Sequence, residues 1–298
     1  MHAIVVHGGG GPEVLSYEEV PDPAPADGQV LVRLEAAGVN HFDLNQRGAP
    51  EASGAKTPYT PGLDGAGTRE DTGERVLVTG SLGTYAELIA APGENVRAIP
   101  DALDAARAAG LGVAYKTAWA CLHDAGLQQG EVLLVQAGSS GTGQAAIDIG
   151  RYLGAEIYAT ASRAKHDHLS EIGAQPLAYD DERIAHLGAA VVFDPVLGDR
   201  FELSLSALEP TGRLVTCGAL DSPLVSLNMW AVVGKRLRII GSGAAAVTPE
   251  QLDQIIGLVA DGSLTGPVVD RELPLDQAAE AHRLVEERQT FGKVLLRP

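Results

Sequence analysis

The sequence predicts an α/β protein in which a partly open β-barrel domain precedes a doubly wound parallel-sheet domain. Three observations predict this fold. Short apolar runs separated by Gly and Pro clusters fill residues 1 to about 110. From Glu131 onward, apolar runs alternate with helical stretches. A glycine-rich turn joins the first of these runs to the first helical stretch.

The N-terminal apolar runs predict short strands. Val30, Val32 and Leu34 recur with a period of two, which is typical of a strand with one buried face. Gly and Pro clusters between the runs favour tight turns, as in a compact and partly open barrel. Further short runs lie at residues 4–6, 76–78 and 87–91.

The middle of the chain predicts a parallel sheet with helices on both faces, because strand and helix candidates alternate there. Strand candidates lie at residues 132–136, 156–160, 190–193, 213–217 and 237–240, and helix candidates at about 141–153, 164–172 and 199–208.

The C-terminal part predicts two helices and a strand. Thr248 and Gln251 have the spacing of a capping box, Pro249 suits the first turn, and Gly262 can end that helix. A second helix is expected at about 276–287 and a final strand at 293–296.

The glycine-rich turn after residues 132–136 carries the strongest chemical signal. Gly138 is expected to permit the tight turn, Ser140 to be small where a pyrophosphate approaches, and Gly143 to let the helix pack closely on the strand. Although Ser140 departs from the G-x-G-x-x-G pattern, and a plain tight turn is the alternative, we predict a Rossmann-type dinucleotide site. Its predicted contacts at this turn are Gly138, Ser139, Ser140, Gly141, Thr142 and Gly143.

The residues after the second strand favour NADPH over NADH. An NAD site usually has an acid about 20 residues past the glycines, and residues 159–165 contain none. Ser162 can bind a 2′-phosphate, and Arg163 and Lys165 can neutralise it. The alternative is that both cations are solvated residues of a helix's first turn.

Composition limits the partners and the location. The formal net charge of −17 repels nucleic-acid phosphates and anionic lipid. No apolar stretch reaches the ~18 residues of a membrane span, and no leader pattern opens the chain. We therefore expect a cytoplasmic protein without a nucleic-acid or membrane partner. Cys121 and Cys217 are expected to be buried free thiols.

Several strings together resemble the medium-chain dehydrogenase/reductase superfamily, and within it the zinc-free, zeta-crystallin-like quinone oxidoreductases. The resemblance implies a GroES-like catalytic domain at residues 1–111, rejoined by residues 247–298, and a Rossmann NADPH-binding domain at residues 112–246. It also implies an active site in the cleft between these domains, and a homodimer joined through sheet edges. The strings lie at residues 36–43, 58–67, 83–87, 115–119, 281–284 and 291–296.

The same resemblance argues against a metal. Zinc-dependent relatives carry a cysteine where this chain has Val39 and Asn40, and a His-Glu pair where it has Leu63 and Asp64. Leu63 cannot bind zinc, the lobe for a structural zinc is reduced to residues 68–75, and the eight histidines are scattered. We therefore expect no metal.

The resemblance also implies roles near the reaction. Asn40 would donate to the substrate oxygen, and Thr117 would sit beside the nicotinamide. Asp43 would lie by the cleft or, equally, anchor a neighbouring turn. The tyrosine that the family often has after this pair is missing, and Tyr59 or Tyr115 could replace it, unless each is a packing residue.

For the cofactor, the family pattern implies that Ser162, Arg163, Lys165 and Tyr179 surround the adenosine phosphate end. Cys217 and Gly218 would approach the nicotinamide half. Lys293 would reach the cofactor from the C-terminal segment, or would be a solvated lysine.

The predicted function is NADPH-dependent reduction of a small quinone or enone by hydride transfer, with a proton from solvent. One alternative is an enoyl-thioester or alkene reductase on the same scaffold. Another is an NADPH-binding protein with a structural or sensory role and little turnover.

Overall fold

A computed structural model describes residues 1–298, which form two compact units. The first unit comprises Met1–Val113, Asp253–Gly262 and Pro267–Pro298, and the second comprises Ala114–Leu252 and Ser263–Gly266. The functional domain boundaries drawn from the sequence, after residues 111 and 246, stay a prediction.

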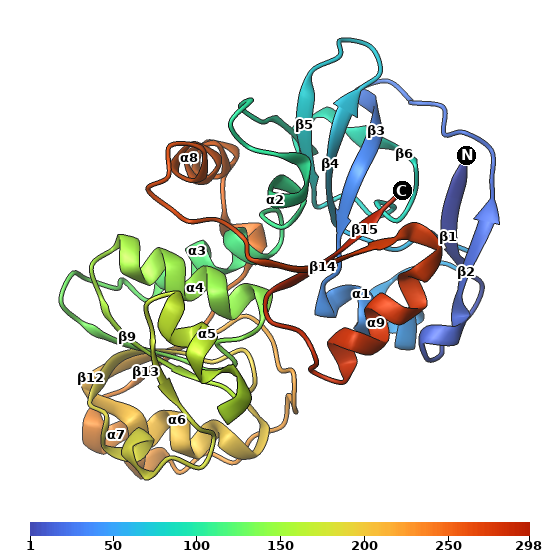
Figure 1. Cartoon of the computed structure of the whole chain (residues 1–298). Coiled ribbons are helices and arrows are strands. Elements are labelled where there is room, and N and C mark those ends of the chain that lie inside the picture. Colours follow the sequence, from blue (N-terminus) through green and yellow to red (C-terminus); the bar gives the residue numbers. More distant parts are fainter. The chain divides into compact units, whose positions relative to one another are not determined.

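The first unit is built on a seven-stranded sheet with the order β14-β15-β3-β4-β5-β7, in which β6 also pairs with β3. All pairs are antiparallel except β14 with β15. In Figure 1, β3, β4 and β5 lie side by side. A separate antiparallel pair joins β1 (His2–Val6) to β2 (Leu15–Glu19). The sheet strands are β3 (Gln29–Gly38), β4 (Asp64–Arg69), β5 (Arg75–Thr79), β6 (Leu88–Pro92), β7 (Val96–Ala98), β14 (Val269–Pro274) and β15 (Lys293–Arg297).

Alternation along β3 sets the core of this unit. Val32 and Leu34 are buried while Arg33 and Glu35 are exposed, which confirms the predicted period of two. The helices are short, namely α1 (His41–Gly48), α2 (Ala105–Ala109) and α9 (Ala278–Glu286). A second cluster includes Ile4, Tyr85, Ala281 and Leu296, so residues from both ends of the chain share one core.

The second unit has a six-stranded, all-parallel sheet with the order β10-β9-β8-β11-β12-β13. Counted from β8, this is the order 3-2-1-4-5-6 of the Rossmann fold, and the predicted α/β class is confirmed. In Figure 1, α4 and α5 lie on one side of the sheet and α6 and α7 on the other. The strands are β8 (Val132–Val135), β9 (Glu156–Thr160), β10 (Gln175–Leu177), β11 (Ala189–Phe193), β12 (Leu208–Thr216) and β13 (Arg238–Gly241).

The helices of this unit are α3 (Ala114–Asp124), α4 (Gly141–Tyr152), α5 (His166–Glu171), α6 (Phe201–Ala207) and α7 (Met229–Lys235). The predicted strands and helices are present, whereas β10, α3 and α7 were not predicted. The helix α8 (Pro249–Ala260) starts with the predicted capping box: Thr248 Oγ1 accepts from Gln251 N at 3.3 Å, and Thr248 N donates to Gln251 Oε1 at 2.9 Å. None of the helices combines the length and the apolar character needed to span a membrane.

Candidate functional site

The glycine-rich turn between β8 and α4 differs in one detail from the sequence prediction. The residue in the left-handed region is Ala137, with φ 54°, and not Gly138. Gly138 is needed for a different reason, because a Cβ there would lie 2.7 Å from Cβ of Ala159 on β9. Its backbone N–H donates to Thr160 O at 2.9 Å, so the turn is fastened to the neighbouring strand.

Gly143 lets the helix pack on the turn rather than on the strand, which corrects the predicted packing partner. A Cβ at Gly143 would lie 2.3 Å from the carbonyl oxygen of Ala137. Close packing of α4 on the sheet depends on Gly150, which the sequence analysis missed: its Cβ would lie 2.8 Å from Leu133 Cδ2 of β8. Two glycines of α4 therefore permit two separate close contacts: Gly143 with the turn, and Gly150 with β8.

The start of α4 is built to face an anion. Ser140 is the N-cap, and its Oγ accepts from Gly143 N at 3.0 Å. Gly141 and Thr142 are the first two residues of the helix, and N–H groups in a first helical turn lack an acceptor within the helix. The positive end of the helix dipole adds to these donors, so the turn suits a pyrophosphate.

A buried polar network fixes the carboxyl ends of three neighbouring strands beside this turn. Thr160 Oγ1 donates to Gln136 Oε1 at 2.7 Å, and Gln136 Nε2 donates to Ser204 Oγ at 3.1 Å. Ser204 Oγ in turn donates to Asp194 Oδ2 at 2.7 Å. All four side chains are buried. Sequence reasoning missed this network because its members are scattered along the chain.

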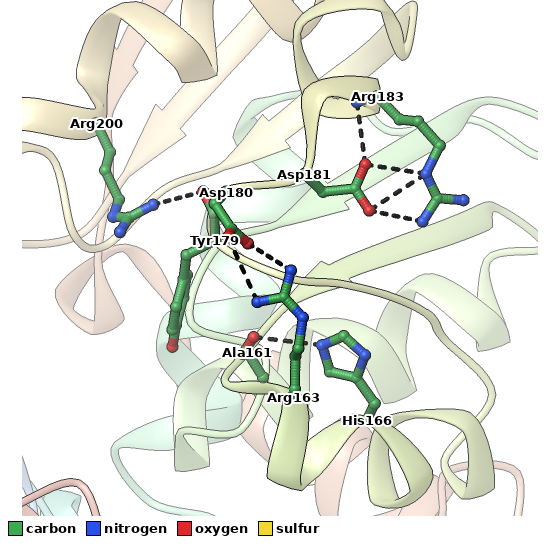
Figure 2. Close-up of polar contacts among 8 residues, drawn as sticks. All are labelled: Ala161, Arg163, His166, Tyr179, Asp180, Asp181, Arg183 and Arg200. Atoms are coloured by element: carbon green, nitrogen blue, oxygen red, sulfur yellow. Dashed lines mark hydrogen bonds and ion pairs between the residues drawn. The ribbon is translucent and has the colours of Figure 1, made fainter.

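The residues predicted at the adenosine end lie beside one another after β9 and β10. Figure 2 shows Arg163 and Asp180 pointing toward one another, with Nη2 2.9 Å from Oδ1 and Nη1 3.4 Å from Oδ2. Arg200 stacks its guanidinium 4.7 Å above the ring of Tyr179 and donates to the Tyr179 carbonyl oxygen at 2.8 Å. Sequence reasoning missed both Asp180 and Arg200.

Ser162 and Lys165 flank Arg163 in this segment, at either end of the turn that opens before α5. Arg163 is exposed, with 72% of its side chain accessible. The segment follows the carboxyl end of β9, the edge of a parallel sheet where ligands bind in such folds. Their contact with a cofactor stays a prediction.

The residues predicted for the nicotinamide half follow β12. Thr216 Oγ1 accepts from Gly218 N at 3.3 Å and donates to Gly218 O at 2.7 Å, which shapes the turn. Cys121 is buried as expected, whereas Cys217 is only half-buried. The interaction between the two free thiols raises the pKa of Cys217 and lowers that of Cys121.

In the first unit, Asn40 lies at the centre of a buried polar cluster. Its Nδ2 donates to Asp64 Oδ1 at 2.7 Å and to Gly38 O at 3.2 Å, and its Oδ1 accepts from Lys293 Nζ at 2.7 Å. Lys293 Nζ also donates to Val39 O at 3.0 Å. Lys293 is 3% exposed, so the alternative of a solvated lysine is wrong. The role of Asn40 as a substrate donor stays a prediction.

Asp43 anchors the turn that starts α1. Its Oδ2 accepts from Asn40 N at 2.9 Å and from the Tyr85 hydroxyl at 3.0 Å. Complete burial, and then the charge of Asp64, raises the pKa of Asp43 to about 7. This is the anchoring role that the sequence left open, and a direct role at the cleft stays a prediction.

The cluster continues from Tyr85 to residues that sequence reasoning missed. The Tyr85 hydroxyl lies 3.1 Å from His282 Nε2, and His282 Nδ1 lies 3.1 Å from Arg47 Nη1. Arg47 also pairs with Glu286. Burial, and then Arg47, lowers the pKa of His282 to about 3, so this imidazole is neutral at physiological pH.

The remaining predicted side chains lie in different surroundings. The buried Tyr59 hydroxyl has no hydrogen-bond partner, and burial raises its pKa to about 12. Thr117 is buried on α3. The Tyr115 hydroxyl donates to Asp148 Oδ2 at 2.8 Å, which assigns Tyr115 to packing.

Two family models match the chain. One is described as an alcohol dehydrogenase GroES-like domain and matches residues 26–101, and the other is described as a zinc-binding dehydrogenase and matches residues 166–296. The quinone oxidoreductase of Sus scrofa is 31% identical over 322 aligned positions, which cover 99% of this chain and 97% of that protein. The first unit accordingly has the predicted GroES-like fold.

Two solved structures are also similar over 100% of this chain and 100% of their own. One is described as an NAD-dependent alcohol dehydrogenase and is 30% identical with a TM-score of 0.92. The other is a mycobacterial protein in complex with NADPH, which is 26% identical with a TM-score of 0.91. Similarity alone therefore leaves both nicotinamide cofactors open.

The residues present do not suit a zinc ion. No group of three His, Cys, Asp or Glu side chains gathers in the structure. Asp64 could bind a metal, but its oxygens accept from Asn40 Nδ2 and, at 2.9 Å, from Val113 N. The Lys293 ammonium lies 3.9 Å from Asp64 and would repel a second cation. The positive charge next to Asp64 is thus supplied by the side chain of Lys293.

Proposed function

Since the chain belongs to the medium-chain dehydrogenase/reductase superfamily and is an oxidoreductase similar to quinone oxidoreductases, we propose that it reduces quinones or α,β-unsaturated carbonyls with NADPH and without zinc. The observation that carries the proposal is the start of α4 after the turn from β8, a geometry that suits a bound anion, with Arg163 beyond the end of β9.

The cofactor would be held along the carboxyl edge of the parallel sheet. The N–H groups at Gly141 and Thr142 bind the pyrophosphate, and Arg163 and Lys165 neutralise a 2′-phosphate. Cys217 and Gly218 line the path of the nicotinamide half, and Thr117 is assigned beside the nicotinamide. NADPH supplies a hydride when bound, and the network around Gln136 keeps this edge rigid. The stacked pair of Tyr179 and Arg200 supports the adenosine end.

The substrate oxygen would be bound in the first unit. Asn40 can donate to it by exchanging its longer bond, the 3.2 Å contact with Gly38 O, while Asp64 and Lys293 keep the amide oriented. Tyr59 is a second donor, because its hydroxyl is unpaired and its raised pKa keeps it protonated. Asp43 acts through Asn40, whose backbone it fixes.

Reduction of an activated acceptor suits a site without a metal. A zinc ion would be needed mainly to hold an alkoxide in alcohol oxidation. An enolate or quinolate has a delocalised charge, and it needs only hydrogen-bond donors and a proton from solvent. The Lys293 ammonium adds a fixed positive charge close to Asn40.

We further propose that the protein is a homodimer joined through β13. This strand is the outer edge of the parallel sheet, so one side of its backbone has no partner strand in this chain. Exposed apolar side chains lie on this strand and on the segment of chain that leads into it, and pairing with a second copy about a twofold axis is proposed to cover them. They are Leu224 (83% exposed), Val225, Leu227, Met229, Trp230 (81% exposed), Val233 and Ile239.

The decisive experiment is a turnover assay with NADPH and NADH against quinones, enones and enoyl thioesters, with metal analysis of the same sample. We expect NADPH oxidation with a quinone or an enone and no stoichiometric zinc. Turnover restricted to enoyl thioesters would reassign the substrate, and tight NADPH binding without any turnover would favour a sensory role. Stoichiometric zinc in an active sample would contradict the metal-free proposal.

A further inference from the structure

The acid that the sequence lacked after β9 comes instead from the next strand of the sheet. β9 and β10 are parallel neighbours, with Leu177 opposite Thr160. Both strands therefore end at the same edge, and the segments that follow them meet there. Arg163 follows β9, and Asp180 follows β10.

Asp180 forms an ion pair with the guanidinium of Arg163, the group that is expected to bind a 2′-phosphate. Both terminal nitrogens of Arg163 face the two carboxylate oxygens of Asp180, at 2.9 and 3.4 Å (Figure 2). The contact lowers the pKa of Asp180, so this carboxylate is ionised at neutral pH. A phosphate at the same nitrogens would have to displace it.

The two other arginines near Arg163 already have partners. Arg200 is bound to the ring and the carbonyl oxygen of Tyr179. Arg183 makes a fork with Asp181, whose oxygens lie 2.7–3.2 Å from its nitrogens. Asp180 is thus the carboxylate that bears directly on Arg163.

We propose that Asp180 is a specificity-determining residue. It reduces the difference between the affinities for NADPH and NADH, so that the site also accepts NADH. The inference rests on the proposed function, because it assigns Arg163 to the cofactor. With NADPH, Asp180 gives up Arg163 and repels the 2′-phosphate. With NADH, it accepts from the ribose 2′-hydroxyl, as an acid after the second strand does in NAD sites.

The exposure of the pair explains why NADPH is not excluded. Arg163 and Asp180 are 72% and 71% exposed, and an ion pair in water is easily exchanged. The phosphate carries a larger negative charge than the carboxylate, so it competes well for the guanidinium. The two effects of Asp180 therefore shift the balance between the cofactors without abolishing either.

The test is Asp180→Asn in the full-length protein, with dissociation constants for NADPH and NADH measured by nucleotide fluorescence at one low ionic strength. We expect NADPH to bind about five- to tenfold more tightly and NADH to bind equally or up to about threefold more weakly. Adenosine 2′,5′-bisphosphate and 5′-AMP, used as competitors, should show the same divergence, which locates the effect at the adenosine end.

The matched control is Asp181→Asn, since this neighbouring acid pairs with Arg183 instead. It should leave the ratio of the two dissociation constants within about twofold of wild type. An unchanged ratio in Asp180→Asn, or an equal change in Asp181→Asn, would overturn the role of Asp180. A wild-type protein that binds neither nucleotide would instead overturn the proposed function.

Discussion

Replacing Lys293 by Met should destabilise the first unit severely. The side chain is 3% exposed and Asp64 is fully buried, so the substitution leaves a carboxylate without its nearest positive charge. It also removes the donor to Asn40 Oδ1 at 2.7 Å and to Val39 O at 3.0 Å. Removing one partner of a buried ion pair costs about 3–5 kcal/mol. Urea unfolding followed by far-UV circular dichroism should show a midpoint lower by about 1–2 M.

The pH dependence of Lys293→Met tests the electrostatic reason for this loss. Burial already raises the pKa of Asp64, and Lys293 opposes that shift. Without Lys293 the folded state holds a proton on Asp64 up to a higher pH than the unfolded state does. The stability of the variant should therefore fall as pH rises, by up to about 1.4 kcal/mol per pH unit, until the pH passes the folded-state pKa.

A double-mutant cycle completes this test. Asp64→Asn in the Lys293→Met background should recover part of the lost stability, because the uncompensated charge is gone, whereas Asp64→Asn alone should destabilise. The reasoning would be refuted by a Lys293→Met variant that loses less than about 1 kcal/mol. It would equally be refuted if the loss were independent of pH and unchanged by Asp64→Asn.

Three other predictions follow from the described contacts. Arg163→Ala should weaken NADPH binding about tenfold and NADH binding less than about threefold, measured by nucleotide fluorescence; equal weakening would contradict the phosphate assignment. Trp230→Asp should convert the proposed dimer to a monomer in light scattering, while Tyr152→Asp, a control at another exposed aromatic, should not. Between pH 4 and 6.5 the raised pKa of Asp43 makes stability fall with pH, and the lowered pKa of His282 makes it rise. Asp43→Asn should remove the first effect and leave the second, so the urea midpoint of this variant should increase with pH. A midpoint that does not change with pH would contradict the opposite effects assigned to Asp43 and His282.

The cofactor unit could be predicted closely because its signals are local. Apolar runs, the glycine-rich turn and the helix start before Gly141 all fall within a few residues of one another. The short strand β10 was missed because Gln175–Leu177 is only three residues long and contains a proline. Its omission hid Asp180, since the expected position of an acid was counted from the glycines along the chain and not across the sheet.

The polar cluster of the first unit could not be predicted from the sequence, because its contacts are not local. Asn40 and Asp43 were singled out, but the residues that bind them come from distant parts of the chain. Lys293, which donates to Asn40, lies 253 positions away, and Tyr85, which donates to Asp43, lies 42 positions away; neither has a local pattern that predicts this contact. Neighbours in space determine whether a lysine is solvated or buried, and one sequence does not contain that information.

The place of β15 has a consequence for biosynthesis. This strand pairs with β3 in the core sheet of the first unit, so the two halves of that pairing are made some 250 residues apart. On the ribosome, the end of β3 at residues 37–38 stays unpaired on its β15 side while the whole parallel sheet is translated and can fold, whereas residues 29–33 can already pair with β6. The segment synthesised first is thus completed last, and its closure coincides with the arrival of the ammonium that neutralises Asp64. Molecules released early would present an unpaired strand and an incomplete oxidoreductase.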